Sequence, residues 1–243
     1  MEPKKRSRAN WFRAAFLFVT VAGAFGAVTA LFHPDSPLPN QWNPLEPLDV
    51  TNPVTPLTAW KLRRAQKDAQ LCIDVLSEAA VFERFEDKID SEFCGIAPRL
   101  QIDRLGQTAV SSLETACATA LTTAMWEHHS LQPRALDILG TKIDRIDHVG
   151  SYSCRRIRTL SGASSDWSTH ARALALDVSG FGTVDGRTID LLKDWDDEDA
   201  EANFLRLVRD DACDWFGLTL SPDFNSLHAD HFHLQVNGWG GCR

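Results

Sequence analysis

Three histidines and an aspartate crowd into the stretch SLHADHFHLQ near the C-terminus of the chain. His228, Asp230, His231 and His233 lie within six positions, although the 243 residues include only eight histidines. Imidazole nitrogens and carboxylate oxygens are common zinc ligands, and the same groups carry protons in hydrolases. The cluster is therefore either a polar surface loop or one side of a metal site. The other segments of the chain decide between these alternatives.

The segment HFHLQV has the alternation of a half-buried β-strand. Successive side chains of a strand point to opposite faces, so His231, His233 and Gln235 are expected on one face. The other face is apolar and consists of Phe232, Leu234 and Val236. We expect the apolar face to pack into the core and the histidine face to open into a cleft.

A second candidate strand, RALALDVSG, carries one carboxylate, Asp177. Its large apolar face consists of Leu174, Leu176 and Val178, and the face of Asp177 is otherwise small, with Ala173, Ala175 and Ser179. His170 precedes Asp177 by seven positions, so one unbroken strand would put the two on opposite faces. The preceding SGASSDWSTH is rich in serine and glycine, which favours a turn that brings His170 back to the same cleft.

Two histidines and one carboxylate that leave a fourth position open form a catalytic rather than a structural zinc site. The sequence therefore predicts a catalytic-type zinc site formed by His170, Asp177 and a histidine of the H-x-H segment. The chain has no pair of H-x-[ST] motifs, which argues against the phosphodiester-cleaving enzymes that use two of them. For the histidines without comparable neighbours we expect surface or local hydrogen-bonding roles: His128, His129 and His148.

Helices and strands must position these residues. Helices are predicted over 58–79, 111–129 and 196–217, and strands over 142–153, 171–181 and 231–236. The acidic run that opens the third helix lies where the helix dipole favours negative charge, so we interpret it as a solvated helix start and not as a cation site. There are no internal repeats. The mixture predicts a single α+β domain over residues 58–243.

The segment before this domain has the features of an export signal. Residues 1–13 carry five of the 25 basic residues, and residues 14–32 are uncharged over 19 positions, close to the roughly 20 that span a bilayer. The basic flank predicts that the N-terminus stays inside and the body lies outside the cytoplasm. We favour an uncleaved single-pass anchor in the inner membrane. The alternative is a cleaved signal peptide, for which VTA at Val28–Ala30 is a weak site.

Residues 33–57 contain seven of the 11 prolines and show no amphipathic period. Proline-rich linkers are semi-rigid, at about 3.1 Å per residue, so this stretch is expected to act as a spacer of about 75 Å. The alternative, that this stretch is a ligand for the aromatic groove of a partner, lacks a clear PxxP cluster.

Six cysteines follow the apolar segment, at 72, 94, 117, 154, 213 and 242. An even number outside the cytoplasm predicts three disulfides, with 15 connectivities open. No CxxC motif occurs, which argues against a thiolate zinc site or a thioredoxin-like redox centre. The net charge of −8 gives no basic footprint for nucleic acid.

Several of these motifs resemble known families. STHARALALDVSGF followed by HADHFH resembles the S-x-H-x6-D … H-x-H signature of the LAS metallopeptidases, which include lysostaphin, D-Ala-D-Ala peptidases and the hedgehog fold. GSYSCR, ALALDVSGF, DGR, PDFNSLHADHFH and the terminal GCR are similar to the bacterial extensin-like C-terminal domain family, over residues 72–243. The resemblance implies an α+β fold with a small, mainly antiparallel sheet and flanking helices.

The resemblance also implies a zinc peptidase that acts on peptidoglycan stem peptides, with His170, Asp177 and His233 as the metal ligands. HADHFH has the spacing of the murein endopeptidases, which favours an endopeptidase. His231 is then a candidate general base or transition-state stabiliser. Dipeptidase relatives place a glutamate base where this chain has Asp230, so the base is either His231 or Asp230.

Four further positions follow from the resemblance. Arg155 is similar to an arginine that follows a strand-borne tyrosine, here Tyr152, and would bind an oxyanion or a substrate carboxylate. His228 matches the first histidine of the endopeptidase spacing, and Ser168 the serine of the signature. We expect His228, Ser168 and Tyr152 to contact substrate or to support the ligands. The family glycine after the first ligand is Ala173 here, which leaves nearly the same room.

Two other functions fit the same motifs. The domain can be a cell-wall-binding module that retains the metal as a structural element, as in hedgehog-like relatives. It can also be a D,D- or L,D-carboxypeptidase or a dipeptidase, which trims the ends of stem peptides.

Overall fold

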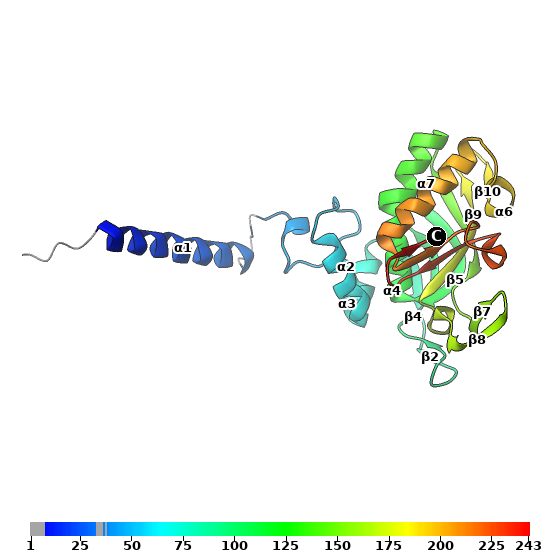
Figure 1. The fold of residues 1–243 in the computed structure, drawn as a ribbon, viewed down its shortest axis with the longest axis horizontal. Coiled ribbons are helices and arrows are strands. Elements are labelled where there is room, and N and C mark those ends of the chain that lie inside the picture. Colours follow the sequence, from blue (N-terminus) through cyan, green and yellow to red (C-terminus); the bar gives the residue numbers. More distant parts are fainter. Residues whose placement is uncertain (1–7, 33–35, 37) are drawn as a thin grey trace, which may run out of the picture.

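The computed structural model describes residues 8–32, 36 and 38–243 of the chain. An apolar helix, α1 (Arg8–Phe32), precedes a folded α+β domain (Figure 1). The basic residues Lys4, Lys5 and Arg6, which belong to the predicted orientation signal, lie outside the described residues.

Helix α1 has the length and composition of a membrane span. Its window Trp11–Phe32 has a mean hydropathy of 2.1, and none of that window is buried. An N-terminal signal sequence has the same features, so both sequence alternatives fit this helix.

Within the described part of the chain, nine strands form one sheet in the order β1-β4-β5-β6-β9-β12-β11-β13, with β10 paired to β9. The pairs are antiparallel except β5–β6 and β11–β13. The strands are β1 (Ala80–Arg84), β4 (Arg99–Leu105), β5 (Thr108–Ala116), β6 (Ile143–Gly150), β9 (Ala175–Thr183), β10 (Thr188–Asp190), β11 (Leu218–Leu220), β12 (Phe232–Gln235) and β13 (Gly241–Cys242). The predicted α+β class and mainly antiparallel sheet are confirmed, and the sheet is larger than expected.

Two short hairpins stand outside this sheet: β2 (Lys88–Ile89) with β3 (Gly95–Ile96), and β7 (Arg156–Thr159) with β8 (Gly162–Trp167). The helices of the domain are α2 (Thr58–Lys67), α3 (Ala69–Ser77), α4 (Cys117–Trp126), α5 (Gln132–Arg134), α6 (Leu191–Asp194) and α7 (Ala200–Trp215). Short 3₁₀ turns are η1 (Asn40–Trp42), η4 (Thr169–Arg172) and η5 (Ser226–His228), and π-helical turns are η2 (Glu127–Leu131) and η3 (Ala135–Leu139).

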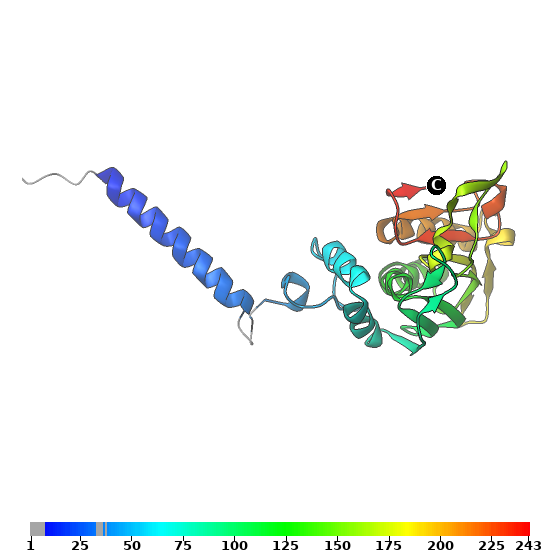
Figure 2. The same ribbon diagram turned by 90° about the horizontal axis from the view of Figure 1, so that it is seen from below.

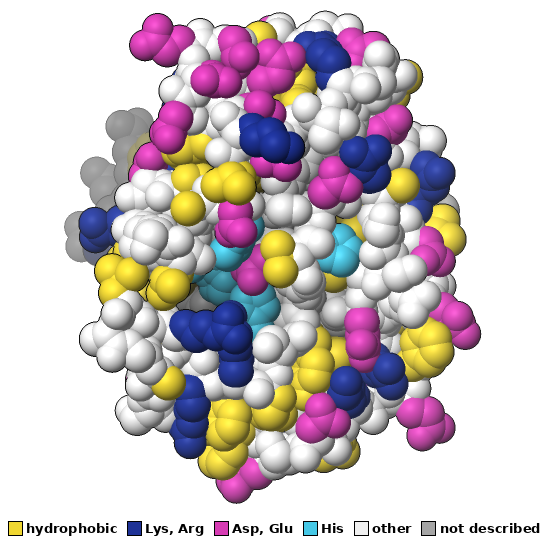
Figure 3. Space-filling view, turned by 90° about the vertical axis from the view of Figure 1, so that its right-hand side faces the viewer, with side chains coloured by type: hydrophobic (Ala, Val, Ile, Leu, Met, Phe, Trp, Pro, Cys, Tyr) yellow, Lys and Arg dark blue, Asp and Glu magenta, His cyan; other side chains and the backbone are white. Residues whose placement is uncertain are grey.

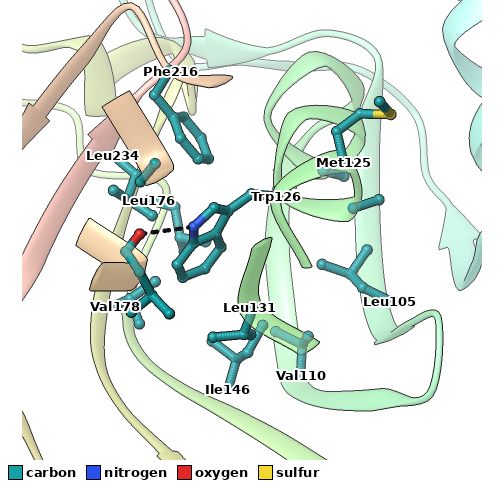
Figure 4. Close-up of a cluster of buried hydrophobic side chains, with 14 of the residues drawn as sticks. Leu105, Val110, Met125, Trp126, Leu131, Ile146, Leu176, Val178, Phe216 and Leu234 are labelled. Atoms are coloured by element: carbon teal, nitrogen blue, oxygen red, sulfur yellow. Dashed lines mark hydrogen bonds between the residues drawn. The ribbon is translucent and has the colours of Figure 1, made fainter. Parts of the chain in front are cut away.

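The core lies between the sheet and helices α4 and α7, and α2 and α3 lie beside α4 (Figures 1 and 2). Trp126 from α4 points toward the apolar side chains of β9 and β12, which include Leu176, Val178 and Leu234 (Figure 4). Its indole Nε1 donates to the Val208 carbonyl of α7 at 3.0 Å. This packing buries one face of β9 and β12, so the polar side chains of these strands point to the opposite face.

The predicted strands at 142–153, 171–181 and 231–236 correspond to β6, β9 and β12. Leu174 differs from the expectation, because it precedes β9 and packs in a separate small cluster with Ile96 and Ala116. The α7 prediction is confirmed with shorter bounds, and Asp199 caps the helix by accepting from the Ala202 amide.

Two helix predictions are wrong in part. The helix predicted over 58–79 divides at Asp68, whose backbone is extended and whose carboxylate accepts from the amides of Gln70 and Leu71 at the start of α3. The helix predicted over 111–129 begins only at Cys117, because residues 111–116 belong to β5 and pair with β4. Alternating burial along β5, with Leu113 opposite Ile102, favours the strand over the helix.

The proline-rich stretch is not a free spacer over its whole length. Leu48 and Val50 are buried in the main core. The buried Lys61 ammonium donates to the carbonyl oxygens of Asn40 at 2.6 Å and Pro47 at 3.4 Å. Burial of apolar side chains and satisfaction of these carbonyls favour a docked segment over an extended one. The folded part therefore begins near residue 39 and not at 58.

The predicted three disulfides are confirmed, and the structure selects their connectivity: Cys72–Cys117, Cys94–Cys154 and Cys213–Cys242. The first joins α3 to α4, the second joins the β2–β3 hairpin region to the segment after β6, and the third joins α7 to β13. Each bridge therefore ties a peripheral element to the sheet or to the helix next to it.

We expect replacement of both Cys94 and Cys154 by serine to lower the free energy of unfolding by about 2–5 kcal/mol. The bridge closes a loop with a sequence separation of 60 residues, and its loss frees that loop in the unfolded chain. Denaturant unfolding of the purified protein without reductant measures the effect. Six titratable thiols in the native exported protein would contradict the disulfide assignment.

Candidate metal centre

Strands β9 and β12 place two of the predicted ligands directly opposite each other. Asp177 and His233 are register partners in this antiparallel pair. The Nδ1 atom of His233 lies 2.9 Å from Oδ1 of Asp177. Their neighbours Leu176, Val178 and Leu234 fill the core on the other face. The alternation inferred from the sequence therefore gives the carboxylate and the imidazole a common face.

His170 reaches the same face from the turn η4. The hydroxyl of Ser168 accepts from the His170 amide at 3.3 Å and caps this turn. The turn ends at Ala173, which has a left-handed backbone with φ of 51°. The chain then enters β9, so His170 lies before the strand as the odd spacing required.

Buried hydroxyl groups hold this turn in place. The Ala173 carbonyl accepts from Thr119 at 2.7 Å and from Thr115 and Ser151 at 3.3 Å. The single hydrogen of the Ser151 hydroxyl is shared with the Ala175 carbonyl, which lies at the shorter distance of 2.6 Å. Hydrogen bonds from β5, α4 and the end of β6 thus fix the chain between the first and second predicted ligands.

The three predicted ligands converge. One donor atom from each of His170, Asp177 and His233 lies within 4.8 Å of the others. His170 Nε2 is 3.1 Å from Asp177 Oδ2 and 3.2 Å from His233 Nδ1. The side chains are 3%, 12% and 11% exposed in that order, so the donors are largely shielded from water.

The outward nitrogens of both imidazoles have acceptors. His170 Nδ1 lies 2.9 Å from the Ser151 carbonyl, which must accept a hydrogen there and leaves the Nε2 lone pair directed at the centre. His233 Nε2 lies 3.4 Å from Oε1 of Gln235, which also accepts from Thr169 at 3.0 Å. Histidines that bind metals characteristically donate their other nitrogen in this way. Two such imidazoles and a carboxylate fit a zinc ion in donor type and orientation.

The carboxyl group of Asp177 is ionised in this setting. Burial acts to raise its pKa, but hydrogen bonding and electrostatic interaction with His170 and His233 outweigh burial and lower the pKa well below its usual range. A carboxylate that is charged and largely buried requires cationic partners. The centre is therefore suited to a cation.

His231 and Asp230 lie beside the three ligands. His231 Nε2 is 3.7 Å from Oδ1 of Asp177, and His231 Nδ1 is 2.7 Å from Oδ1 of Asp230. The side chain of His231 is 13% exposed, whereas that of Asp230 is 61% exposed. Asp230 thus holds the outer nitrogen of His231, and the inner nitrogen faces the centre.

His228 and Arg155 complete the charged surroundings. The His228 ring lies 5.3 Å from the His231 ring and 5.9 Å from the His233 ring, and burial with the nearby histidines lowers its pKa to about 4. Burial also lowers the pKa of Arg155, as does the charge of Arg158, while Asp177 acts in the opposite direction. Asp177 is therefore close enough to influence Arg155. Figure 3 shows histidines gathered in a hollow, with acidic and basic side chains around them.

The structure places Tyr152 elsewhere. Its hydroxyl donates to the Asp90 carboxylate, its ring packs on the small cluster of Ile96, and burial together with Asp90 raises its pKa to about 12. The other predicted residues lie at or beside the centre. Sequence reasoning missed three residues that support the ligands, namely Ser151, Thr169 and Gln235. Gln235 was on the predicted histidine face, and Ser151 lay in the quoted GSYSCR motif.

Comparison with known proteins gives one match. The family model described as "Extensin-like protein C-terminus" matches residues 70–243. No curated protein and no solved structure matches the chain. The match spans every residue of the candidate metal centre and all six cysteines.

Proposed function

The chain belongs to the extensin-like protein C-terminus family, and for its domain we propose zinc-dependent hydrolysis of amide bonds in peptidoglycan, most closely as an endopeptidase of stem peptides or cross-links. The observation that carries the proposal is the convergence of one donor atom each from His170, Asp177 and His233. The peptidoglycan substrate follows from the resemblance of HADHFH to murein endopeptidases and from the apolar export segment.

His170 Nε2, a carboxylate oxygen of Asp177 and His233 Nδ1 would hold the zinc ion. Bound there, zinc would supply a Lewis acid that polarises the scissile carbonyl and activates water. Ser151 and Gln235 keep the two imidazoles in the required orientation through their outer nitrogens. Three protein ligands leave room for water and substrate, as catalytic zinc sites do.

His231 is the general base in this proposal. Its Nδ1 donates to Asp230, so its Nε2 carries the lone pair on the side of the centre. His231 can take a proton from the attacking water and then give it to the leaving amine. Asp230 acts through His231, as a carboxylate that positions the ring and stabilises its charged form.

Arg155 binds the substrate in this proposal. Its side chain is near enough to Asp177 for the two charges to interact. Its guanidinium group donates a long hydrogen bond of 3.4 Å to the neighbouring Arg156 carbonyl. A guanidinium group with free donors suits a carboxylate or a developing oxyanion.

Profiling of muropeptides from sacculi digested with the zinc-loaded protein tests the proposal. Loss of cross-linked dimers identifies the endopeptidase, and shortened stems identify a carboxypeptidase or dipeptidase instead. An unchanged profile contradicts hydrolysis and leaves cell-wall binding as the function.

We further propose that α1 anchors the chain in the inner membrane and that the domain lies in the periplasm. Alkaline phosphatase fused after Thr58 is expected to be active, because the basic flank of α1 is retained inside the cytoplasm. The matched control lacks residues 14–32 and should be inactive. Activity of a cytoplasmic reporter in the first fusion would overturn this location. A mature protein without residues 1–30 would replace the anchor by a cleaved signal.

A further inference from the structure

A cavity of about 800 Å³ lies where the end of α3 and the start of β1 meet the β4–β5 turn and η2. Its residues are separate from those of the candidate metal centre. Apolar side chains form much of the wall: Val50, Ala79, Ala80, Val81, Ala124, Pro133 and Leu136. The volume is in the range of small-molecule sites.

A buried carboxylate lies in this otherwise largely apolar lining. Glu127, the first residue of η2, is 3% exposed. Its Oε1 accepts from the Thr108 hydroxyl at 2.6 Å and from the Gln132 amide at 3.0 Å. No described residue donates a hydrogen bond to Oε2. One oxygen is thus fixed by the protein, and the other remains available to a ligand.

Gly106 of the β4–β5 turn packs closely against this oxygen on one side. Gly106 has a φ of 53°, and a Cβ atom at this position would lie 2.8 Å from Glu127 Oε2. The other charged groups of the lining, Glu78 and Lys142, are exposed and opposite in sign. The exposed His128 also lines the cavity. Among the described residues of the lining, Glu127 is therefore the one acidic or basic side chain that is largely withdrawn from water.

We propose that this cavity binds a primary alkylammonium ion, whose N–H group donates to Oε2 of Glu127 and whose alkyl chain lies on the apolar wall. A largely buried carboxylate is stabilised by a cationic group, and a cationic N–H donor can form a charge-assisted hydrogen bond with its open oxygen. The apolar wall accounts for the alkyl chain, since contact there removes apolar surface from water. This site is independent of the proposed peptidase activity.

Binding of n-butylammonium to the full chain in lipid nanodiscs, followed by ligand-observed NMR, tests the proposal. We expect saturable binding that Glu127→Gln weakens about ten- to a hundred-fold, since hydrogen bonds to charged groups contribute that much. The amide of this variant keeps an oxygen for Thr108 and Gln132. Glu78→Gln is the matched control, because it removes an exposed charge from the same lining and should change the affinity less than about twofold.

Two further probes separate the contribution of the charge from that of the N–H donor, and both are measured on the protein without substitutions. n-Butanol lacks the charge and tetramethylammonium lacks the N–H donor, so both should bind more weakly than n-butylammonium. Equal binding of n-butanol, or unchanged affinity in a folded Glu127→Gln variant, would overturn the proposal. The probe comparison decides the matter even if that variant does not fold.

Discussion

His233→Ala is expected to reduce bound zinc from about one equivalent per chain to almost none and to lower amide hydrolysis by at least about 10³-fold. His233 is the only proposed ligand on β12, so its removal leaves His170 and Asp177 without a donor from the strand that pairs with β9. Two remaining protein ligands are too few for a stable zinc site of this type. Elemental analysis and muropeptide profiling of the same preparation measure both losses.

His148→Ala is the matched control for this prediction. His148 lies on β6, in the same sheet, and its Nε2 interacts with the Ser111 carbonyl. This variant should keep its zinc and its activity. If His233→Ala retains both zinc and activity and circular dichroism shows a native fold, the proposed metal centre is contradicted.

His231→Ala is expected to keep zinc but to lose about 10²–10⁴-fold in hydrolysis, the usual contribution of a general acid–base group. The side chain faces the centre without being one of the three converging ligands. Rates of amide hydrolysis at equal zinc content give the measurement. The variant separates proton transfer from metal binding, which His233→Ala does not.

Asp230→Asn distinguishes the two candidate bases. If Asp230 only positions His231, the amide still accepts the hydrogen from Nδ1, and activity falls less than in His231→Ala. The opposite ranking, with a fully active His231→Ala and an inactive Asp230→Asn, would assign the base to Asp230.

The common face of Asp177 and His233 could be predicted from the sequence because strand alternation is a local property. Phe232 and Leu234 are buried in the core, so His233 between them must face outward, and the same rule holds for Asp177 between Leu176 and Val178. The supports of the ligands were harder to predict. Ser151 holds His170 through a backbone carbonyl, which every residue carries, and no residue type signals that role.

Element boundaries were less predictable where two signals compete. Residues 111–116 read as part of an alanine- and threonine-rich helix, but pairing with β4 makes them a strand. At Asp68 the helix breaks because the Asp68 carboxylate caps the next helix, although the apolar periodicity of the sequence continues across the break. Both errors arise from interactions between segments or from a single cap, which a periodic pattern does not contain.

The docking of the proline-rich segment limits how far the domain can extend from α1. If α1 spans a bilayer as proposed, the docking of the segment that begins near residue 39 limits the connection to the six residues 33–38, which can bridge at most about 25 Å. A short tether confines the domain to a thin layer and raises its effective concentration there, at the expense of more distant targets. Lengthening this connection would therefore let the domain act farther from the membrane without changing the candidate metal centre.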